Sequence, residues 1–165
     1  MDVNEAVGAR LRVLRTASGW SLSELARRTG LGKGTLSELE SGQRNPTLAT
    51  LFAVTTALGL PLSAAVPDEA GPVSGDAVDA WLIERLPGAD VFRLLVRPGT
   101  VQVSAPHAQG VTEQVLVVAG RLIVAHGVVL GPGETLAYDG GVPHRWQALE
   151  GPVSAVLVMR YPVTG

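Results

Sequence analysis

The N-terminal fold is decided by residues 21–42, which read SLSELARRTGLGKGTLSELESG. Ser21 and Glu24 form a Ser-x-x-Glu capping box, in which each side chain satisfies the other residue's backbone N–H, so a helix is predicted to begin there. Gly30 ends this helix, because glycine adopts the left-handed conformation of a helix C-terminus without steric cost. A three-residue turn then opens a second helix from about Lys33 to Glu40. The stretch therefore predicts two short helices joined by a tight turn.

Helical periodicity continues on both sides of this pair. Before it, apolar residues at i, i+4, i+8 and i+11 mark one face of a helix: Val3, Val7, Leu11 and Leu14. After Asn45-Pro46, a further helix is expected from about Thr47 to Leu58, and Pro61–Ala65 adds one more helical turn. Two short helices with a glycine-containing turn and flanking helices are typical of the helix-turn-helix arrangement. We expect an all-α, five-helix domain here.

The second part of the chain is predicted to be all-β. Short Val- and Leu-rich runs are separated by Gly and Pro turns at roughly 8–12-residue spacing, which is typical of a sandwich or barrel. The nine runs are Val78–Leu86, Val91–Arg97, Val101–Ser104, Glu113–Ala119, Leu122–Ala125, Val128–Leu130, Thr135–Tyr138, His144–Leu149 and Val153–Arg160.

Composition supports two domains in 165 residues. We predict a helix-turn-helix domain at 1–66, a Pro/Gly-rich linker at 67–76 and a β domain at 77–165. Residues 1–66 carry seven Lys/Arg and five Asp/Glu, a net of +2, whereas 67–165 carry six and ten, a net of −4. The chain has no cysteine, which excludes disulfides and thiolate metal sites. Without a membrane-spanning run or a secretory signal, a cytoplasmic protein with no membrane partner is expected.

Residues 7–65 resemble the phage-repressor-like DNA-binding domain of the XRE family of transcription regulators. The resemblance is carried by residues 9–12 (ARLR), 21–31 (SLSELARRTGL), 36–42 (LSELESG) and 44–46 (RNP). It implies binding to a double-stranded DNA operator, and it implies that Arg15 and Glu40 form a structural ion pair. A helical bundle for protein contacts, or an antitoxin-type domain, is the alternative.

Candidate DNA contacts follow from angular position on the helix at about 33–40. Because the N-terminus of this recognition helix enters the major groove, side chains that point away from the core there can reach bases. The candidates are Lys33, Gly34, Thr35, Ser37 and Glu38, with Arg27, Arg28 and Arg44 as candidate phosphate contacts. Lys33 would suit guanine O6/N7 and Glu38 cytosine N4. Alternatively, Lys33 neutralises only a phosphate, and Glu38 and the arginines are simply solvated. Operator specificity normally takes two copies, so a homodimer is expected.

The β domain contains all three histidines: His107, His126 and His144. On an extended strand, residues of the same parity share one face, which would group His107, Gln109 and Glu113 with Val115 and Val117. His144 would share a face with Trp146. Two histidines and a carboxylate from separate strands, meeting inside a barrel, suit a facial metal site for zinc, iron, manganese or nickel. His126 lies beside a Gly turn and is expected to be exposed.

The same region, about residues 93–161, resembles the small cupin barrels, which have a jelly-roll fold. His107-x-Gln109-x3-Glu113-x6-Gly120 is similar to the first cupin motif, and Gly133-x5-Asp139-x-Gly141-x2-His144 is similar to the second. Gln109 stands where the motif has a ligand histidine, and a neutral amide is a weaker donor. The resemblance therefore implies one divalent metal on His107, Glu113 and His144, with Gln109 as a further donor. Otherwise these side chains line a polar effector pocket with Val115, Val117, Tyr138 and Trp146 as walls.

Three functions are compatible with this organisation. The first is a ligand-responsive transcription regulator whose cupin domain senses a small molecule, with or without a metal. The second is a metal-dependent dioxygenase or isomerase fused to a DNA-binding domain. The third is a cupin that serves only as a dimerisation module. The combination of the two domains implies the first, which needs no catalytic residue.

Overall fold

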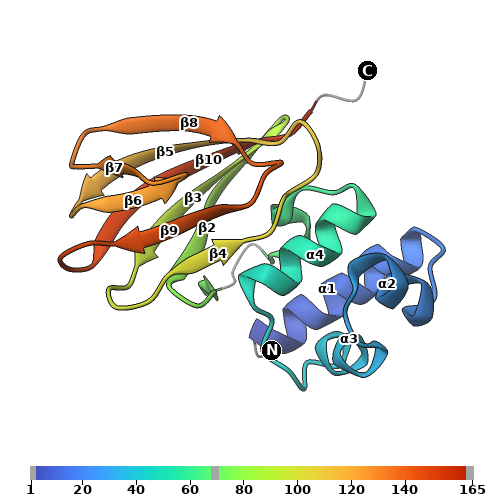
Figure 1. Ribbon diagram of the computed structural model, residues 1–165. Coiled ribbons are helices and arrows are strands. Elements are labelled where there is room, and N and C mark those ends of the chain that lie inside the picture. The colour runs from blue at the N-terminus through green and yellow to red at the C-terminus, as the bar shows by residue number, and fades with distance from the viewer. Residues whose placement is uncertain (1–2, 68–70, 163–165) are drawn as a thin grey trace. The chain divides into compact units, whose positions relative to one another are not determined.

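The computed structural model describes residues 3–67 and 71–162, with the side chain of Val3 left out. The chain divides into two compact units, residues 1–71 and 72–165, and each is described by itself. The first unit is helical and the second is made of strands (Figure 1). Within the described residues, no helix is long and apolar enough to span a membrane.

The helical unit contains four α-helices and one 3₁₀ turn. These elements are α1 (Val3–Ala17), α2 (Leu22–Thr29), α3 (Lys33–Glu40), α4 (Leu48–Leu58) and η1 (Leu62–Ala65). The further helical turn predicted at Pro61–Ala65 is present as a single 3₁₀ turn, so four of the five predicted helices are α-helices. The reason is local: Pro61 and Pro67 bracket the segment, and a residue before proline is disfavoured in the α conformation, so the turn cannot be extended.

The predicted caps of α2 are largely confirmed. The Ser21 hydroxyl accepts from the Glu24 N–H at 3.1 Å, and Gly30 ends the helix with φ of 73°. The Glu24 carboxylate, which the capping box would direct to the backbone of Ser21, bonds Arg27 and Arg28. These caps fix the turn between α2 and α3, and so they fix where α3 begins.

Leucines from three helices hold α3 in place. The fully buried side chains include Leu11 from α1, Leu25 from α2, and Leu36 and Leu39 from α3. Because Leu36 and Leu39 are three residues apart, they share one face of α3, and the opposite face is left to solvent.

The predicted ion pair of Arg15 and Glu40 is confirmed. It ties α1 to the end of α3 through two bonds, from Nε at 2.6 Å and from Nη2 at 2.7 Å. The Arg15 guanidinium also donates to the Trp20 carbonyl at 2.7 Å. Both side chains are mostly buried, so the pair belongs to the scaffold.

Gly8 is a point of close approach between α1 and α3. A Cβ built at this position would overlap the Leu39 carbonyl oxygen and would lie 3.1 Å from the Gly42 nitrogen. Backbone therefore packs on backbone, which only glycine allows.

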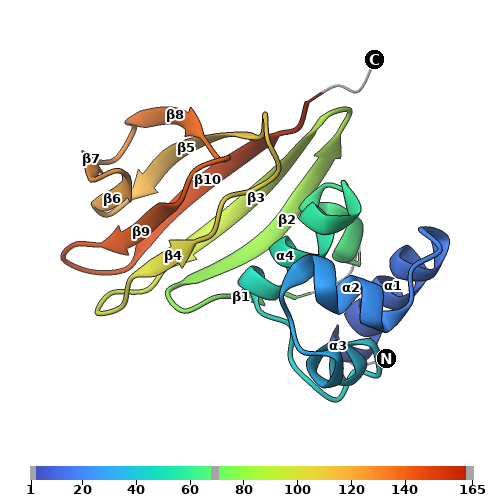
Figure 2. The ribbon, with the colours of Figure 1, turned by 45° about the vertical axis from the view of Figure 1, so that its right-hand side comes forward.

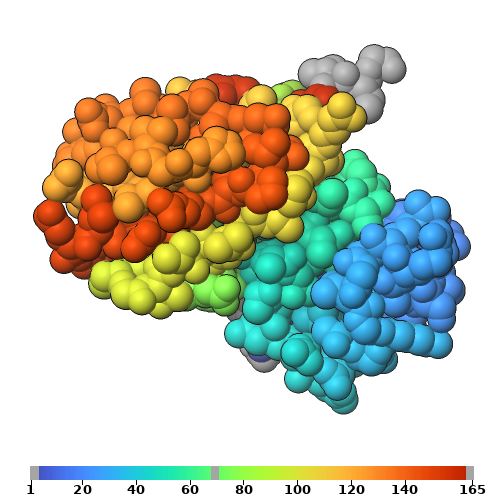
Figure 3. All heavy atoms as spheres, in the orientation of Figure 1, coloured from blue at the N-terminus to red at the C-terminus, as the bar shows by residue number. Residues whose placement is uncertain are grey.

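The β unit is a sandwich of two antiparallel sheets, a jelly-roll arrangement as the cupin resemblance implies (Figures 1 and 2). The strands are β1 (Val73–Ser74), β2 (Val78–Leu86), β3 (Ala89–Val96), β4 (Gln102–Ser104), β5 (Thr112–Ala119), β6 (Leu122–Ala125), β7 (Val128–Leu130), β8 (Thr135–Asp139), β9 (His144–Ala148) and β10 (Val153–Arg160). All nine predicted strands are present, within two residues at each end. Figure 3 shows the same unit in space-filling form, coloured yellow-green to red.

The larger sheet has the order β1-β2-β3-β10-β5-β8, and the smaller one β4-β9-β6-β7. The last strand in the sequence, β10, lies between β3 and β5 and pairs with both along most of its length. Its residues Val153, Ala155, Leu157 and Met159 alternate into the core. This alternation is the period-2 pattern of a strand with one buried face.

The predicted linker at 67–76 is shorter in the structure. Val73 and Ser74 form β1, which pairs with β2, and Val73 is buried. Residues 68–70 lie outside the described residues. The side-chain oxygen of Gln102 accepts from the Ala77 N–H at 3.2 Å and so holds the chain in place just after the predicted linker.

Candidate functional site

The outer face of α3 carries the predicted base contacts. Lys33, Gly34, Ser37 and Glu38 are exposed, and Thr35 is half-buried. Leu36 and Leu39 on the opposite face hold the helix against the core. The recognition helix thus presents a cation, a hydroxyl and a carboxylate on a rigid element, which is the chemistry needed to bond base edges.

The three predicted phosphate contacts are exposed arginines, and all of them form ion pairs. Arg27 and Arg28 bond the Glu24 carboxylate at 2.7 and 2.6 Å, and their bonds lower the pKa of Glu24 to about 2. Arg44 bonds Glu38 at 3.2 Å. Exposed pairs of this kind are screened by solvent and contribute little to stability, so a DNA phosphate can compete for each arginine. Their role in DNA binding stays a prediction.

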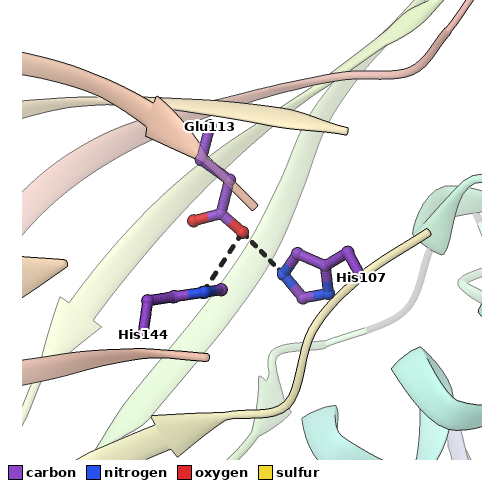
Figure 4. Close-up of side chains that lie close together, drawn as sticks. All are labelled: His107, Glu113 and His144. Atoms are coloured by element: carbon purple, nitrogen blue, oxygen red, sulfur yellow. Dashed lines mark hydrogen bonds and ion pairs between the residues drawn. The ribbon is translucent and has the colours of Figure 1, made fainter. Parts of the chain in front are cut away.

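In the β unit, three ligand-type side chains meet in the interior (Figure 4). Glu113 lies on β5, His144 begins β9, and His107 stands in the loop between β4 and β5. Glu113 Oε1 is 2.6 Å from His107 Nε2 and 3.4 Å from His144 Nε2. All three residues are buried, and their ligand atoms lie within 4.8 Å of one another. The predicted set of two histidines and one carboxylate is therefore brought together.

A second loop positions His107. The His107 N–H donates to the Gly140 carbonyl at 2.9 Å, and the Gly140 N–H donates to the Val111 carbonyl at 2.9 Å. A Cβ at Gly140 would lie only 3.1 Å from Cδ2 of the His107 ring. Glycine at this position therefore lets the backbone pack against the imidazole and sets its orientation.

Gln109 does not join the cluster, so its prediction as a pocket residue and further metal donor was wrong. The side chain is exposed. The parity argument assumed an extended strand from His107 to Val117, but β5 begins only at Thr112. Before it, the chain turns, with the Val111 N–H bonded to the Ala108 carbonyl and Gly110 at φ of 84°. A turn breaks the alternation on which the argument depended.

The strand part of the parity argument is confirmed. Val115 and Val117 are buried on the same face of β5 as Glu113, and Trp146 is buried on the same face of β9 as His144. His126 is exposed, as predicted. These apolar side chains give the cluster a hydrophobic surround.

Tyr138 has a contact that sequence reasoning missed. It was predicted as a pocket wall, but its hydroxyl donates to Glu113 Oε2. The contact follows from strand register, because Glu113 lies directly opposite Tyr138 in the β5–β8 pair. The two carboxylate oxygens of Glu113 thus have different partners: Oε1 faces both histidines, and Oε2 accepts from Tyr138. Only knowledge of the register would have predicted this.

Comparison with known proteins agrees with this architecture. A family model for the helix-turn-helix, HTH_3, matches residues 11–64. The chain is 34% identical over 146 residues to the HTH-type transcriptional regulator SutR of Escherichia coli K12, covering 81% of this chain and 82% of SutR. The chain belongs to the XRE family of helix-turn-helix transcription regulators.

A solved structure of a transcriptional regulator shares the fold over nearly the whole chain. The HTH_3 family transcriptional regulator from Vibrio cholerae matches with a TM-score of 0.84 at 24% identity, covering 97% of each chain. A cupin_2 domain of an XRE family regulator from Enterobacter cloacae covers 52% of this chain and 98% of its own, at 26% identity and a TM-score of 0.49. As a member of the XRE family, the protein is a DNA-binding transcription regulator.

Burial and charge shift the pKa values of three groups in the buried cluster of this XRE regulator. Burial alone would raise the pKa of Glu113, but the two histidines outweigh it and lower the pKa to about 2. Burial likewise opposes the charged form of His144, yet the carboxylate raises the pKa of that imidazole. Burial and the neighbouring carboxylate raise the pKa of Tyr138, so its hydroxyl stays protonated and able to donate. Glu113 is consequently an anion at neutral pH.

The cluster has the donor chemistry of a divalent metal site. Neighbouring donors about 2.1 Å from one ion lie roughly 3 Å apart, and the separations of 2.6 and 3.4 Å bracket that value. His144 Nδ1 lies 2.9 Å from the Val142 carbonyl. A donor bond there directs Nε2 toward Glu113, which is the outer contact that orients a ligating imidazole. His107, Glu113 and His144 therefore fit a metal of the type predicted.

Proposed function

We propose that this protein is an effector-responsive regulator in which a homodimer binds a near-palindromic operator and the cupin unit senses a small molecule at a metal held by His107, Glu113 and His144. The observation that carries the proposal is a buried, charged three-ligand cluster in a chain that is also a DNA reader. A buried ion cluster contributes little to fold stability by itself, because desolvation offsets the attraction. The presence of such a cluster in the interior is better explained by a ligand.

The bound ion would supply open coordination positions for a polar group of the effector. Zinc, iron, manganese and nickel all suit two imidazoles and a carboxylate. In this chain Tyr138 occupies Glu113 Oε2, which leaves Oε1 to face the ion. Val115, Val117 and Trp146 surround the site with apolar side chains that would exclude water and select effector shape.

The proposed regulation is a shift between two dimer arrangements. Two recognition helices bind one operator only when they match half-sites about 34 Å apart. An effector can change operator affinity only if it binds one arrangement more tightly than the other. A tenfold change in operator affinity needs about 1.4 kcal/mol of such preference, which a few contacts at the cluster can supply.

Metal analysis of protein purified without a His-tag tests the site. We expect about one divalent ion per chain in the parent protein and none in His144→Ala. His126→Ala is the matched control, because it removes an exposed histidine outside the cluster and should leave the metal content unchanged. A metal-free parent, or equal loss in both variants, would end the ligand role of the cluster.

Operator binding tests the regulatory part. Duplexes selected by the protein from a random library should show two half-sites, and sedimentation should give a dimer of the 17.1 kDa chain. Stripping the metal, or adding candidate effectors, should change the operator affinity of the parent but not of His144→Ala. Stoichiometric Fe(II) with turnover of a substrate would instead support the dioxygenase alternative.

A further inference from the structure

A cleft opens in the helical unit beside the recognition helix, and the sensing proposed above does not use it. Its volume is about 260 Å³. Three helices contribute its lining, which consists of Arg12, Arg15, Leu22, Ser37, Glu40 and Ser41. The cleft therefore borders α3 on the side of α1 and the first turn of α2.

The charge of this cleft comes from Arg12. Arg15 and Glu40 neutralise each other through two short bonds. Arg12 is exposed, and its guanidinium forms no ion pair with any described residue. In contrast, Arg27, Arg28 and Arg44 are all engaged by carboxylates. Arg10 also has no carboxylate partner among the described residues, but its Nε donates to the Ala64 carbonyl at 2.8 Å and it does not line the cleft. Arg12 is thus the cleft arginine that an incoming anion meets without displacing a carboxylate.

The cleft is continuous with the base-reading face of α3. Ser37 lies one helical turn after Lys33 and one turn before Ser41, so the three share a row along the helix. The Ser41 hydroxyl donates to the Glu38 carbonyl at 3.1 Å, whereas the Ser37 hydroxyl forms no bond to the described part of the chain. A guanidinium and a hydroxyl thus border the cleft, next to the side chains expected to face the bases.

We propose that Arg12 and Ser37 bind one phosphate of the DNA backbone in this cleft, at the strand that borders the groove read by α3, so that Ser37 contacts a phosphate in place of the base predicted for it above. A phosphate suits the site because it is an anion with several acceptor oxygens, and guanidinium and hydroxyl groups donate to such oxygens in protein–DNA complexes. The contact sets the depth and register of α3 and carries no sequence information. The inference rests on the DNA-binding role of the family and is independent of the metal-dependent sensing proposed above.

Salt dependence distinguishes a phosphate contact from other roles. Each phosphate contact contributes about 0.9 to the slope of log K against log salt, which corresponds to about eightfold in affinity at 0.1 M relative to 1 M. A dimer has two such contacts, so Arg12→Gln should lower the slope by about 1.8 and the affinity at 0.1 M by about 60-fold. Arg12→Lys keeps the charge and should retain most of both.

The experiment measures anisotropy of a labelled duplex that the wild-type full-length protein has selected from a random library, titrated at several salt concentrations. Arg121→Gln is the control. It removes the same charge from the exposed ion pair of Arg121 with Glu150 on the β unit and should leave the salt slope unchanged. The ratio of affinities for the selected and a scrambled duplex should stay the same in Arg12→Gln.

Three results would overturn the inference. The first is an unchanged slope in Arg12→Gln at full folding, monitored by circular dichroism. The second is an equal loss in Arg12→Gln and Arg12→Lys, which would point to a structural defect. The third is a changed preference between the duplexes, which would make Arg12 a base reader. Failure of the wild-type protein to enrich any duplex would refute DNA reading itself, a distinguishable outcome.

Discussion

Replacing Gly8 by alanine should weaken the packing of the recognition helix. A Cβ at Gly8 falls on the Leu39 carbonyl oxygen, closer than the 3.0 Å that real Cβ atoms respect, and it lies 3.2 Å from the Glu40 carbonyl carbon. In a helix interior, alanine gains about 1 kcal/mol over glycine. Overpacking of a core costs about 1–3 kcal/mol, and a backbone oxygen cannot be moved by a rotamer change, so the upper end applies. The net expectation is a loss of about 2 kcal/mol.

Gly34→Ala is the matched control for this prediction. Gly34 is also helical, on α3, but a Cβ there meets no atom within 4 Å. The same substitution should therefore stabilise by up to about 1 kcal/mol. Urea unfolding of the full chain, followed by circular dichroism at 222 nm, measures both variants. If Gly8→Ala is as stable as the wild type, or if the two variants shift together, α1 and α3 do not pack as described.

Three further predictions concern buried polar groups. Glu40→Gln leaves the mostly buried Arg15 without its carboxylate and should lower the free energy of unfolding by about 3 kcal/mol; a loss below about 1 kcal/mol would contradict a buried pair. Tyr138→Phe removes the donor to Glu113 and should weaken metal binding at least about tenfold in a chelator competition, where an unchanged affinity would count against the contact. The pKa of His144 is raised above its ordinary value of 6.5, so its stabilisation of the metal-free protein is complete below that pH and is lost as pH rises through the higher folded-state value. Tryptophan-monitored urea midpoints should fall over this range, and Glu113→Gln should abolish the fall.

Much of the fold could be predicted because the signals are local. Ser21 and Gly30 mark the two ends of α2 by backbone chemistry alone. The strands of the β unit could be delimited because Gly and Pro turns interrupt each apolar run. The cluster of His107, Glu113 and His144 was predictable because the resemblance to the two cupin motifs supplies all three residues.

The features that could not be predicted depend on how segments far apart in the sequence meet in the fold. Gln109 was misplaced because the parity argument continued the strand back to His107, across the turn at Gly110, although the predicted apolar run itself begins at Glu113. The bond from Tyr138 to Glu113 depends on the register between β5 and β8. The approach of α1 to α3 at Gly8, and the cleft beside Arg12, exist only once three helices have packed.

The central place of β10 has a consequence during synthesis. β10 lies between β3 and β5 and pairs with both. The larger sheet therefore remains in two parts until residues 153–160 have been synthesised. The helical unit is complete more than 80 residues earlier. A chain that ends before β10 would therefore contain a folded helical unit and an incomplete sheet with unpaired edges at β3 and β5, and such edges are prone to aggregate.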